Sequence, residues 1–246
     1  MPKKYSYRDS HKYPSKGAEY EEHYLAGSWP RYVWSREQQV LLEILEKYFA
    51  SRDINLLDFA CGTGRITSFL ENRVKMSTGV DVSSSMLAIA RKKLEHTKII
   101  QADITTENIL KPRKFNLITA FRFFANAEHE LRSAAIKTLA ELLAEDGYLI
   151  FNNHHNFHSP WIRWSYMRNH QKNPQGIYNV MTINGMKELA GEVGLKIIEI
   201  YPVGFFHPPR IEVPQLIINS IENICCKFKC LTRFSESHIA VCSWCK

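Results

Sequence analysis

The chain has 246 residues, of which 45% are hydrophobic and 23% charged, with a formal net charge of +7. The composition is ordinary for a globular protein, and the length suits one α/β domain with some elaboration. No apolar run reaches the roughly 18 residues of a membrane-spanning helix, and the first residues lack the apolar core of a signal peptide. We therefore expect a cytoplasmic protein.

The positive charge gathers at the two ends of the chain. Residues 1–16 carry five lysines and arginines against Asp9, and residues 227–246 carry four against Glu236, so residues 17–226 have no net charge. Nucleic-acid binders usually concentrate basic residues around their cleft. The distribution therefore does not favour a nucleic-acid partner, although basic ends can attract an anionic membrane surface or an acidic substrate.

The first predicted helix follows a tail without periodicity. Residues 1–18 are polar and basic, which is typical of a loosely held tail. Apolar residues then recur at helical spacing from Glu37 to Phe49 and predict an amphipathic helix. We therefore divide the chain into residues 1–35 and a folded domain over residues 36–246.

The stretch that organises the chain is Asn-Leu-Leu-Asp-Phe-Ala-Cys-Gly-Thr-Gly-Arg, over residues 55–65. Its apolar run ends at Asp58 and turns through Gly62 and Gly64 into an amphipathic segment. This order predicts a strand, a tight loop and a helix, the opening unit of a nucleotide-binding α/β sheet. Glycines allow the backbone to approach a ligand closely, and the helix N-terminus suits a carboxylate or phosphate.

Two further strand-like runs also end in an acid. Asp81 closes the run that starts at Thr78, and Asp103 closes the run that starts at Ile99. An acid at the end of the second strand is suited to bind a ribose diol. A dinucleotide fingerprint would require glycine where Thr67 stands, which disfavours a nicotinamide-linked dehydrogenase.

With the glycine loop, these acid-ended strands resemble the class I S-adenosylmethionine-dependent methyltransferases. The first motif of that family, acid-x-G-x-G-x-G, reads here Asp58-x-Ala60-x-Gly62-x-Gly64, so Ala60 departs from the first glycine. The resemblance implies S-adenosyl-L-methionine as cofactor. It also implies an α/β fold with a Rossmann-like seven-stranded sheet, an antiparallel last strand and helices on both faces. The alternative is an α/β domain that binds no cofactor.

The resemblance also implies roles for individual residues. Gly62 and Gly64 would pass near the methionine moiety, and Asp81 would bind the ribose hydroxyls. Asp58 would order the glycine loop or bind the amino group through it. The further expected contacts are Ala60 in the loop, Val82 and Met86 beside the adenine, Asp103 and Ile104 at the adenine edge and ring, and Phe121 at the end of the fourth strand.

In the resembled family, an aromatic N-terminal segment folds over the cofactor. By this resemblance residues 1–35 form a tail and cofactor lid, with Tyr24 and Arg31 near the methionine moiety. Arg31 would hold the carboxylate through a bidentate pair. The alternative is that both residues only pack against or cap the first helix.

Strands and helices alternate through the rest of the chain. Ser83 can cap the helix that follows the second strand. The remaining expected elements are strands at 114–121, 148–151, 195–201 and 237–243, and helices at 131–146, 182–190 and 216–224.

The predicted catalytic residues follow the fifth strand. His154 and His155 are candidate general bases, because imidazole has an unperturbed pKa of about 6.5; the alternative is that one or both are merely solvated. By resemblance, residues 153–180 form an acceptor-side insertion, whose aromatic and basic composition suits sugars, anionic groups or acyl chains. Arg122 and Arg163 are candidate anchors for an anionic acceptor.

Cysteines concentrate near the end of the chain. The pairs Cys226/Cys230 and Cys242/Cys245 have the short spacings of a zinc site. Cys242 lies in a predicted strand, however, and no glycine-rich knuckle surrounds either pair. We therefore expect buried free thiols and no metal, and we interpret Cys61 as a small loop residue.

Together these observations predict an O- or N-methyltransferase of a small molecule, with a sugar or glycan intermediate or a secondary metabolite as acceptor. The fourth strand ends in Ala-Phe-Arg-Phe and lacks the Asn/Asp-Pro-Pro-Tyr signature of base-amino methyltransferases. An RNA methyltransferase and a catalytically silent, cofactor-binding assembly protein are the alternatives. The oligomeric state is left open.

Overall fold

The computed structural model describes residues 7, 16–25, 27–50, 52–172, 179–205 and 213–245, with only the backbone at 16, 23–25, 170 and 172. These residues form one seven-stranded sheet in the order β3-β2-β1-β4-β5-β7-β6. Pairing is parallel from β3 to β5, and β7 runs antiparallel to both of its neighbours. The strands are β1 (Asn55–Phe59), β2 (Met76–Asp81), β3 (Thr97–Gln101), β4 (Phe115–Ala120), β5 (Leu143–Asn153), β6 (Leu195–Val203) and β7 (Ser237–Trp244).

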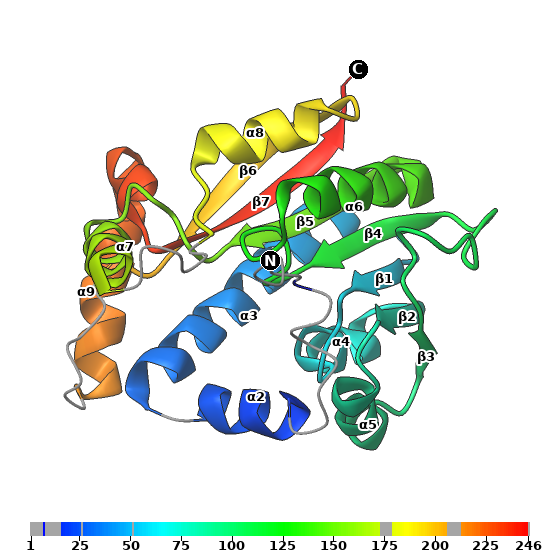
Figure 1. The fold of residues 1–246 in the computed structure, drawn as a ribbon, viewed down its shortest axis with the longest axis horizontal. Helices are drawn as coiled ribbons and strands as arrows, with labels where there is room; N and C mark the ends of the chain where they lie inside the picture. The colour runs from blue at the N-terminus through cyan, green and yellow to red at the C-terminus, as the bar shows by residue number, and fades with distance from the viewer. Residues whose placement is uncertain are drawn as a thin grey trace.

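Helices cover both faces of this sheet (Figure 1). The predicted Rossmann-like architecture with an antiparallel last strand is therefore confirmed. None of the helices in the described ranges is both long and apolar enough to cross a membrane. The helices are α2 (Lys16–Leu25), α3 (Ser28–Phe49), α4 (Arg65–Leu70), η1 (Glu71–Arg73), α5 (Ser84–Lys93), α6 (His129–Leu142), α7 (Pro160–Lys172), α8 (Ile183–Gly191), α9 (Gln215–Lys227) and η2 (Lys229–Phe234).

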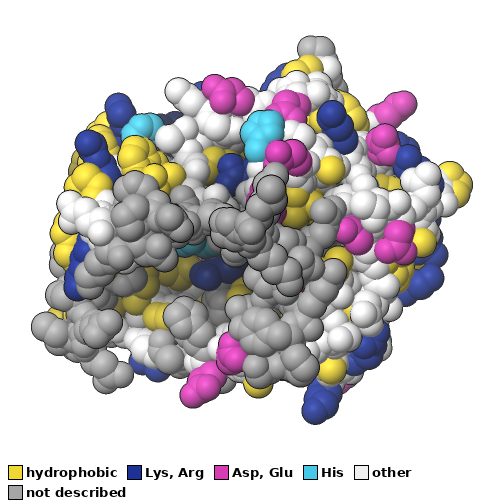
Figure 2. Space-filling model, in the orientation of Figure 1, with side chains coloured by type: hydrophobic (Ala, Val, Ile, Leu, Met, Phe, Trp, Pro, Cys, Tyr) yellow, Lys and Arg dark blue, Asp and Glu magenta, His cyan; other side chains and the backbone are white. Residues whose placement is uncertain are grey.

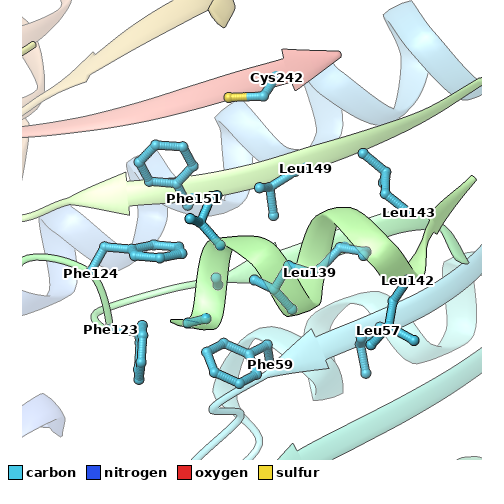
Figure 3. Packing of buried hydrophobic residues seen from close by; sticks show 14 of the residues in the cluster. Leu57, Phe59, Phe123, Phe124, Leu139, Leu142, Leu143, Leu149, Phe151 and Cys242 are labelled. Carbon is cyan, nitrogen blue, oxygen red and sulfur yellow. The ribbon is translucent and has the colours of Figure 1, made fainter. Parts of the chain in front are cut away.

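Alternation along the strands divides the core into two layers. In β5, Leu149 and Phe151 pack into the layer that holds α6 and α8, and Ile150 packs into the layer that holds α3 and α4. Successive strand side chains point to opposite faces, so both faces of β5 are buried. Figure 3 shows Phe151, Phe124 and Leu139 of the first layer packed between the sheet and α6.

The bounds of α3 and α6 differ most from the expected ones. The helix expected from Glu37 already begins at Ser28, because Pro30 lies in its first turn, where a missing N–H costs nothing. The expected division between residues 35 and 36 falls inside this helix. The helix expected to reach Asp146 ends at Leu142, because the chain from Leu143 onward already pairs with β4.

The core layer under α6 yields a test of the packing. Leu139 is 0% exposed, whereas Leu216 on α9 is 78% exposed. We expect Leu139→Ala to lower the free energy of unfolding by about 2–5 kcal/mol, because it removes buried surface and leaves a cavity. Leu216→Ala, the matched control, should change it by less than about 0.5 kcal/mol. Urea denaturation of both variants measures the difference, and equal effects would contradict the assignment of α6 to the core.

Candidate functional site

Parallel pairing of β2, β1 and β4 sets their carboxyl ends along one edge of the sheet. The loops that leave these strands enclose a cavity, here called the sheet-edge cavity. Of the predicted cofactor residues, the structure brings together around it Asp58, Ala60, Gly62, Asp81, Val82, Met86, Asp103 and Phe121.

The glycine loop enters this cavity through a left-handed backbone. Ala60, Gly62 and Gly64 have φ of 53°, 57° and 77°. A Cβ on Gly64 would lie 3.1 Å from the Leu94 side chain, so the loop packs tightly against α5. Ala60 adopts the same conformation with a Cβ present, at a cost of roughly 1–2 kcal/mol. The loop is therefore held in place by its surroundings.

Asp81 provides part of that restraint. Its Oδ2 accepts a hydrogen bond from the backbone N–H of Gly62 at 2.9 Å, and its Oδ1 accepts one from Ser83 N–H at 2.8 Å. A carboxylate offers about four acceptor positions. Asp81 therefore holds the glycine loop against the end of β2, and its carboxylate lies at the wall of the cavity, where a ligand can reach it.

Asp58 lies beneath the loop and is 1% exposed. The hydroxyls of Thr67 and Thr119 donate to its two oxygens, the latter at 2.7 Å. Burial nevertheless raises the pKa of the Asp58 carboxyl to about 6, although these hydrogen bonds act in the opposite direction. A buried acid with a raised pKa favours a cationic ligand group beside it.

The N-terminal residues of the cavity were not predicted from the sequence. Tyr7 and Tyr20 both line it. The Tyr7 hydroxyl donates to the Arg122 carbonyl at 3.1 Å, and its ring meets Phe123 edge-on. Gly17 lets α2 approach α5, because a Cβ there would lie 2.7 Å from Ser85 O. The abundance of tyrosines was the only signal, and it does not indicate which of them reaches the cavity.

Three predicted cofactor residues of the described part of the chain do not line the cavity. Arg31 is exposed beside Pro214 instead, because it projects from the side of α3 that faces away from Val33 and Glu37. Gly64 is the N-cap of α4, and Ile104 is buried in the core. The Tyr24 side chain lies outside the described residues.

A second cavity adjoins the first and is here called the histidine cavity. Arg122 lines both cavities. Arg65 lines the first and forms an ion pair with Glu37, which lines the second. The remaining lining residues are Trp29, Pro30, Val33, His154, His155, Ile162, Val203, Glu236 and Ser237, and the volume is about 340 Å³.

Arg122 leaves β4 in a left-handed conformation with φ of 57°. Its N–H donates to Asn152 Oδ1 at 2.6 Å, and its carbonyl accepts from Asn126 Nδ2 at 2.8 Å and from the Tyr7 hydroxyl. Such a conformation costs about 1–3 kcal/mol in a residue other than glycine and is typical of functional sites. These three hydrogen bonds fix the backbone from which the guanidinium extends between the two cavities.

His154 and His155 lie together, with ring centroids 4.2 Å apart. His155 Nδ1 is 3.3 Å from the Asn179 carbonyl, and His154 Nδ1 is buried with no hydrogen-bond partner among the described residues. Burial lowers the pKa of both imidazoles, and the positive charge of Arg122 lowers each further. Both rings are therefore neutral at pH 7, as a proton acceptor must be.

The cysteines are dispersed in the described structure. Cys242 is buried in β7, whereas Cys230 and Cys245 are exposed. Among residues whose positions are described, no three His, Cys, Asp or Glu side chains are placed to hold a metal ion. Burial raises the pKa of the Cys61 thiol well above its ordinary value, so the thiolate nucleophile is disfavoured.

The buried carboxyl of Asp58 predicts an unusual pH dependence. Its folded pKa of about 6 exceeds the ordinary value of 3.8, so its ionisation costs stability as the pH rises through this window. We expect Asp58→Asn to remove that loss, so that the free energy of unfolding of the wild type falls by about 2.4 kcal/mol relative to that of the variant between pH 4 and pH 7. Urea denaturation across this range provides the measurement. The substitution also alters the hydrogen bonds from the two threonines, but this changes the free energy of unfolding by the same amount at every pH. If the free energies of wild type and variant ran parallel across the pH range, the raised pKa would be contradicted.

Comparisons with known proteins identify a family for this chain. A family model described as a methyltransferase domain matches residues 33–200. An uncharacterized methyltransferase of Oceanobacillus iheyensis is 30% identical over 121 residues, or 49% of this chain and 54% of that protein. A malonyl-[acyl-carrier protein] O-methyltransferase of Priestia megaterium is 32% identical over 123 residues, or 47% of this chain and 42% of that protein. The match thus spans about half the length of these relatives.

Solved structures extend the likeness over nearly the whole chain. The magnesium protoporphyrin IX methyltransferase of Synechocystis PCC 6803, crystallised with bound SAH, has a TM-score of 0.65 and 16% identity over 97% of each chain. A possible histamine N-methyltransferase of Thermotoga maritima has a TM-score of 0.64 and 17% identity, over 92% of this chain and 94% of that chain. Such identities establish the fold alone. Since the family model covers more than half of its residues, the chain belongs to the class I S-adenosylmethionine-dependent methyltransferases.

Proposed function

We propose that the protein transfers a methyl group from S-adenosylmethionine to an oxygen or nitrogen of a small molecule. One observation carries this proposal: the sheet-edge cavity, with its glycine loop and Asp81, meets a cavity that holds two neutral histidines, and Arg122 lines both. Bound S-adenosylmethionine supplies a methyl group activated on a sulfonium. The protein then has to align the acceptor, exclude water and take up a proton.

The residues of the sheet-edge cavity fit this cofactor. Gly62, left-handed and without a side chain, lets a ligand approach the loop, and the Asp81 carboxylate lines the cavity at the end of β2, where it suits the ribose hydroxyls. The buried carboxyl of Asp58 suits the positively charged end of the cofactor. We assign Val82, Met86 and Asp103 to the adenine, and Ala60 and Phe121 to the methionine side. We do not assign the cofactor carboxylate to Arg31, which lies elsewhere on α3.

Cofactor binding can be tested through Asp81. We expect Asp81→Asn to raise the Kd for S-adenosylmethionine roughly 10- to 100-fold, because it weakens charge-assisted hydrogen bonds worth about 1.5–3 kcal/mol. Asp53→Asn is the matched control, because it alters an exposed carboxylate that pairs with Lys75. Isothermal titration calorimetry with S-adenosylmethionine and S-adenosylhomocysteine measures both. An unchanged Kd, or preferential binding of NADH, would contradict the assignment.

The histidine cavity supports a compact polar acceptor. Its volume of about 340 Å³ lies near the lower end of the range of about 300–1,000 Å³ for ligand pockets. The buried atoms there that have no hydrogen-bond partner among the described residues include the two acceptors His154 Nδ1 and Glu37 Oε1. Hydroxyl or amino groups of an acceptor can donate to both, and Trp29 offers an aromatic face. A sugar or glycan intermediate meets these requirements and is the acceptor class that we propose.

His154 or His155 would take the acceptor's proton. We expect substitution of the active base by glutamine to lower the single-turnover rate about 10²- to 10⁴-fold, with the exposed His129→Gln as control. Because the pKa of both imidazoles is lowered, the base stays unprotonated as the pH falls through 6.5. Activity should therefore persist below that pH and decline only in more acidic solution. Unchanged rates at pH 7 in both variants would exclude a histidine base.

The acceptor itself can be found by direct labelling. Transfer of a labelled methyl group into fractionated small molecules and glycans from the source cell, followed by mass spectrometry, would identify the product. Label recovered only in RNA would contradict a small-molecule acceptor. Tight cofactor binding without transfer to any fraction would favour a silent assembly protein.

A further inference from the structure

Helix α9 presents its apolar side to solvent. Ile218 and Glu222 face the protein body, where Glu222 is 0% exposed and accepts from the Tyr32 hydroxyl and from Phe205 N–H. Surface helices normally bury their apolar face and expose their charged one. Here the carboxylate is turned inward, and the exposed large hydrophobic residues are Leu216, Ile217, Ile221 and Ile224, followed by Phe228. The polar Ser220 and Asn223 are exposed among them.

The neighbouring segments extend this surface. On α7, Trp164 and Met167 are exposed, and Phe234 is exposed on η2. Asn156, just before α7, donates from Nδ2 to the carbonyls of Arg233 and Ser235 at 2.9 and 2.7 Å, which holds the start of α7 against the end of η2. We call the exposed apolar and basic residues of α7, α9, Phe228 and η2 the α7–α9 face. Most of the exposed large hydrophobic side chains of the described chain belong to it.

Basic side chains are interspersed with these hydrophobic ones. The guanidinium of Arg168 lies over the Trp164 ring at 5.2 Å, and that of Arg233 lies over the Phe234 ring at 5.0 Å. Figure 2 shows hydrophobic and basic side chains side by side at the left edge, where Figure 1 places α7 and α9. The exposed cations are Arg163, Arg168, Lys227, Lys229 and Arg233.

Acidic side chains do not offset this charge. Within described residues 160–172 and 213–235, the single acid in the sequence is the buried Glu222. The α7–α9 face is therefore both apolar and positively charged. A partner has to offer negative charge at its surface and an apolar layer within reach of side chains as long as Trp164 and Phe228.

We propose that the α7–α9 face docks on an anionic membrane surface. Interfacial helices bury an apolar face at the boundary between headgroups and acyl chains, while lysines and arginines contact anionic headgroups. A second copy of the chain fits less well, because a two-fold interface would place like charges opposite each other. A nucleic acid would match the cations but would leave the isoleucines of α9 without an apolar partner.

Vesicle co-sedimentation tests this proposal with the full chain. We compare vesicles of phosphatidylcholine alone with vesicles of equal parts phosphatidylcholine and phosphatidylglycerol. The charge variant removes three cations of the face through Lys227→Gln, Lys229→Gln and Arg233→Gln. Its control removes three exposed lysines elsewhere through Lys92→Gln, Lys98→Gln and Lys196→Gln.

An apolar variant tests the other component of the face. This variant combines Leu216→Ser, Ile221→Ser and Ile224→Ser. Its control combines Leu42→Ser, Met76→Ser and Ile109→Ser, at three exposed hydrophobic residues outside the face. Because all the substituted side chains are exposed, the variants should keep the wild-type unfolding midpoint, which urea denaturation checks. Sedimentation velocity without lipid reports self-association.

We expect wild type to bind the anionic vesicles and not the neutral ones, and binding to weaken as salt screens the charges. The charge variant should bind roughly 100-fold more weakly, since each cation near an anionic surface contributes about a factor of five. The apolar variant should bind at least about 10-fold more weakly, and both controls should bind as wild type does. Absence of binding, equal binding by variants and controls, or dimerisation through this face would overturn the proposal. None of these measurements depends on methyl transfer.

Discussion

Parallel pairing of β1 with β2 and β4 is the constraint on which the site depends. It places three strand exits at one edge of the sheet, so residues far apart in sequence reach one cavity. The backbone is left-handed at Ala60, just after β1, and at Arg122, just after β4. Hydrogen bonds hold both turns in place: Cys61 N–H donates to the Val80 carbonyl, and Arg122 N–H donates to Asn152 Oδ1. The Asp81 carboxylate does the same for Gly62. The strain is thus tolerated because the surrounding scaffold is rigid.

Burial also sets the electrostatics of the two cavities. Removal of water raises the pKa of the Asp58 carboxyl on one side and lowers the pKa of His154 and His155 on the other. Arg122 lines both cavities, and its positive charge lowers the pKa of the two histidines further. The buried Asp58 carboxyl therefore favours a positively charged ligand in the sheet-edge cavity. The neutral imidazoles favour a proton-donating ligand in the histidine cavity.

The same packing that orders the site also decides what faces solvent. The Glu222 carboxylate accepts from Tyr32 on α3 and from Phe205 after β6, which fixes the rotation of α9 about its axis. The aliphatic side of α9 consequently points outward and joins the exposed residues of α7 and η2. Ile162 of α7 also lines the histidine cavity, so one helix contributes to both the cavity and the α7–α9 face.

The sequence by itself determined the strands, the glycine loop and Asp81 at the cavity, because these depend on neighbours within a few residues and on a sheet edge that parallel strands must share. Tertiary structure alone decided that Tyr7 and Tyr20 line the cavity, that Arg31 points away, and that Arg122 meets the two histidines. It also decided which side of α9 is buried. Periodicity shows that a helix has two faces, but only long-range packing selects the face that meets the protein.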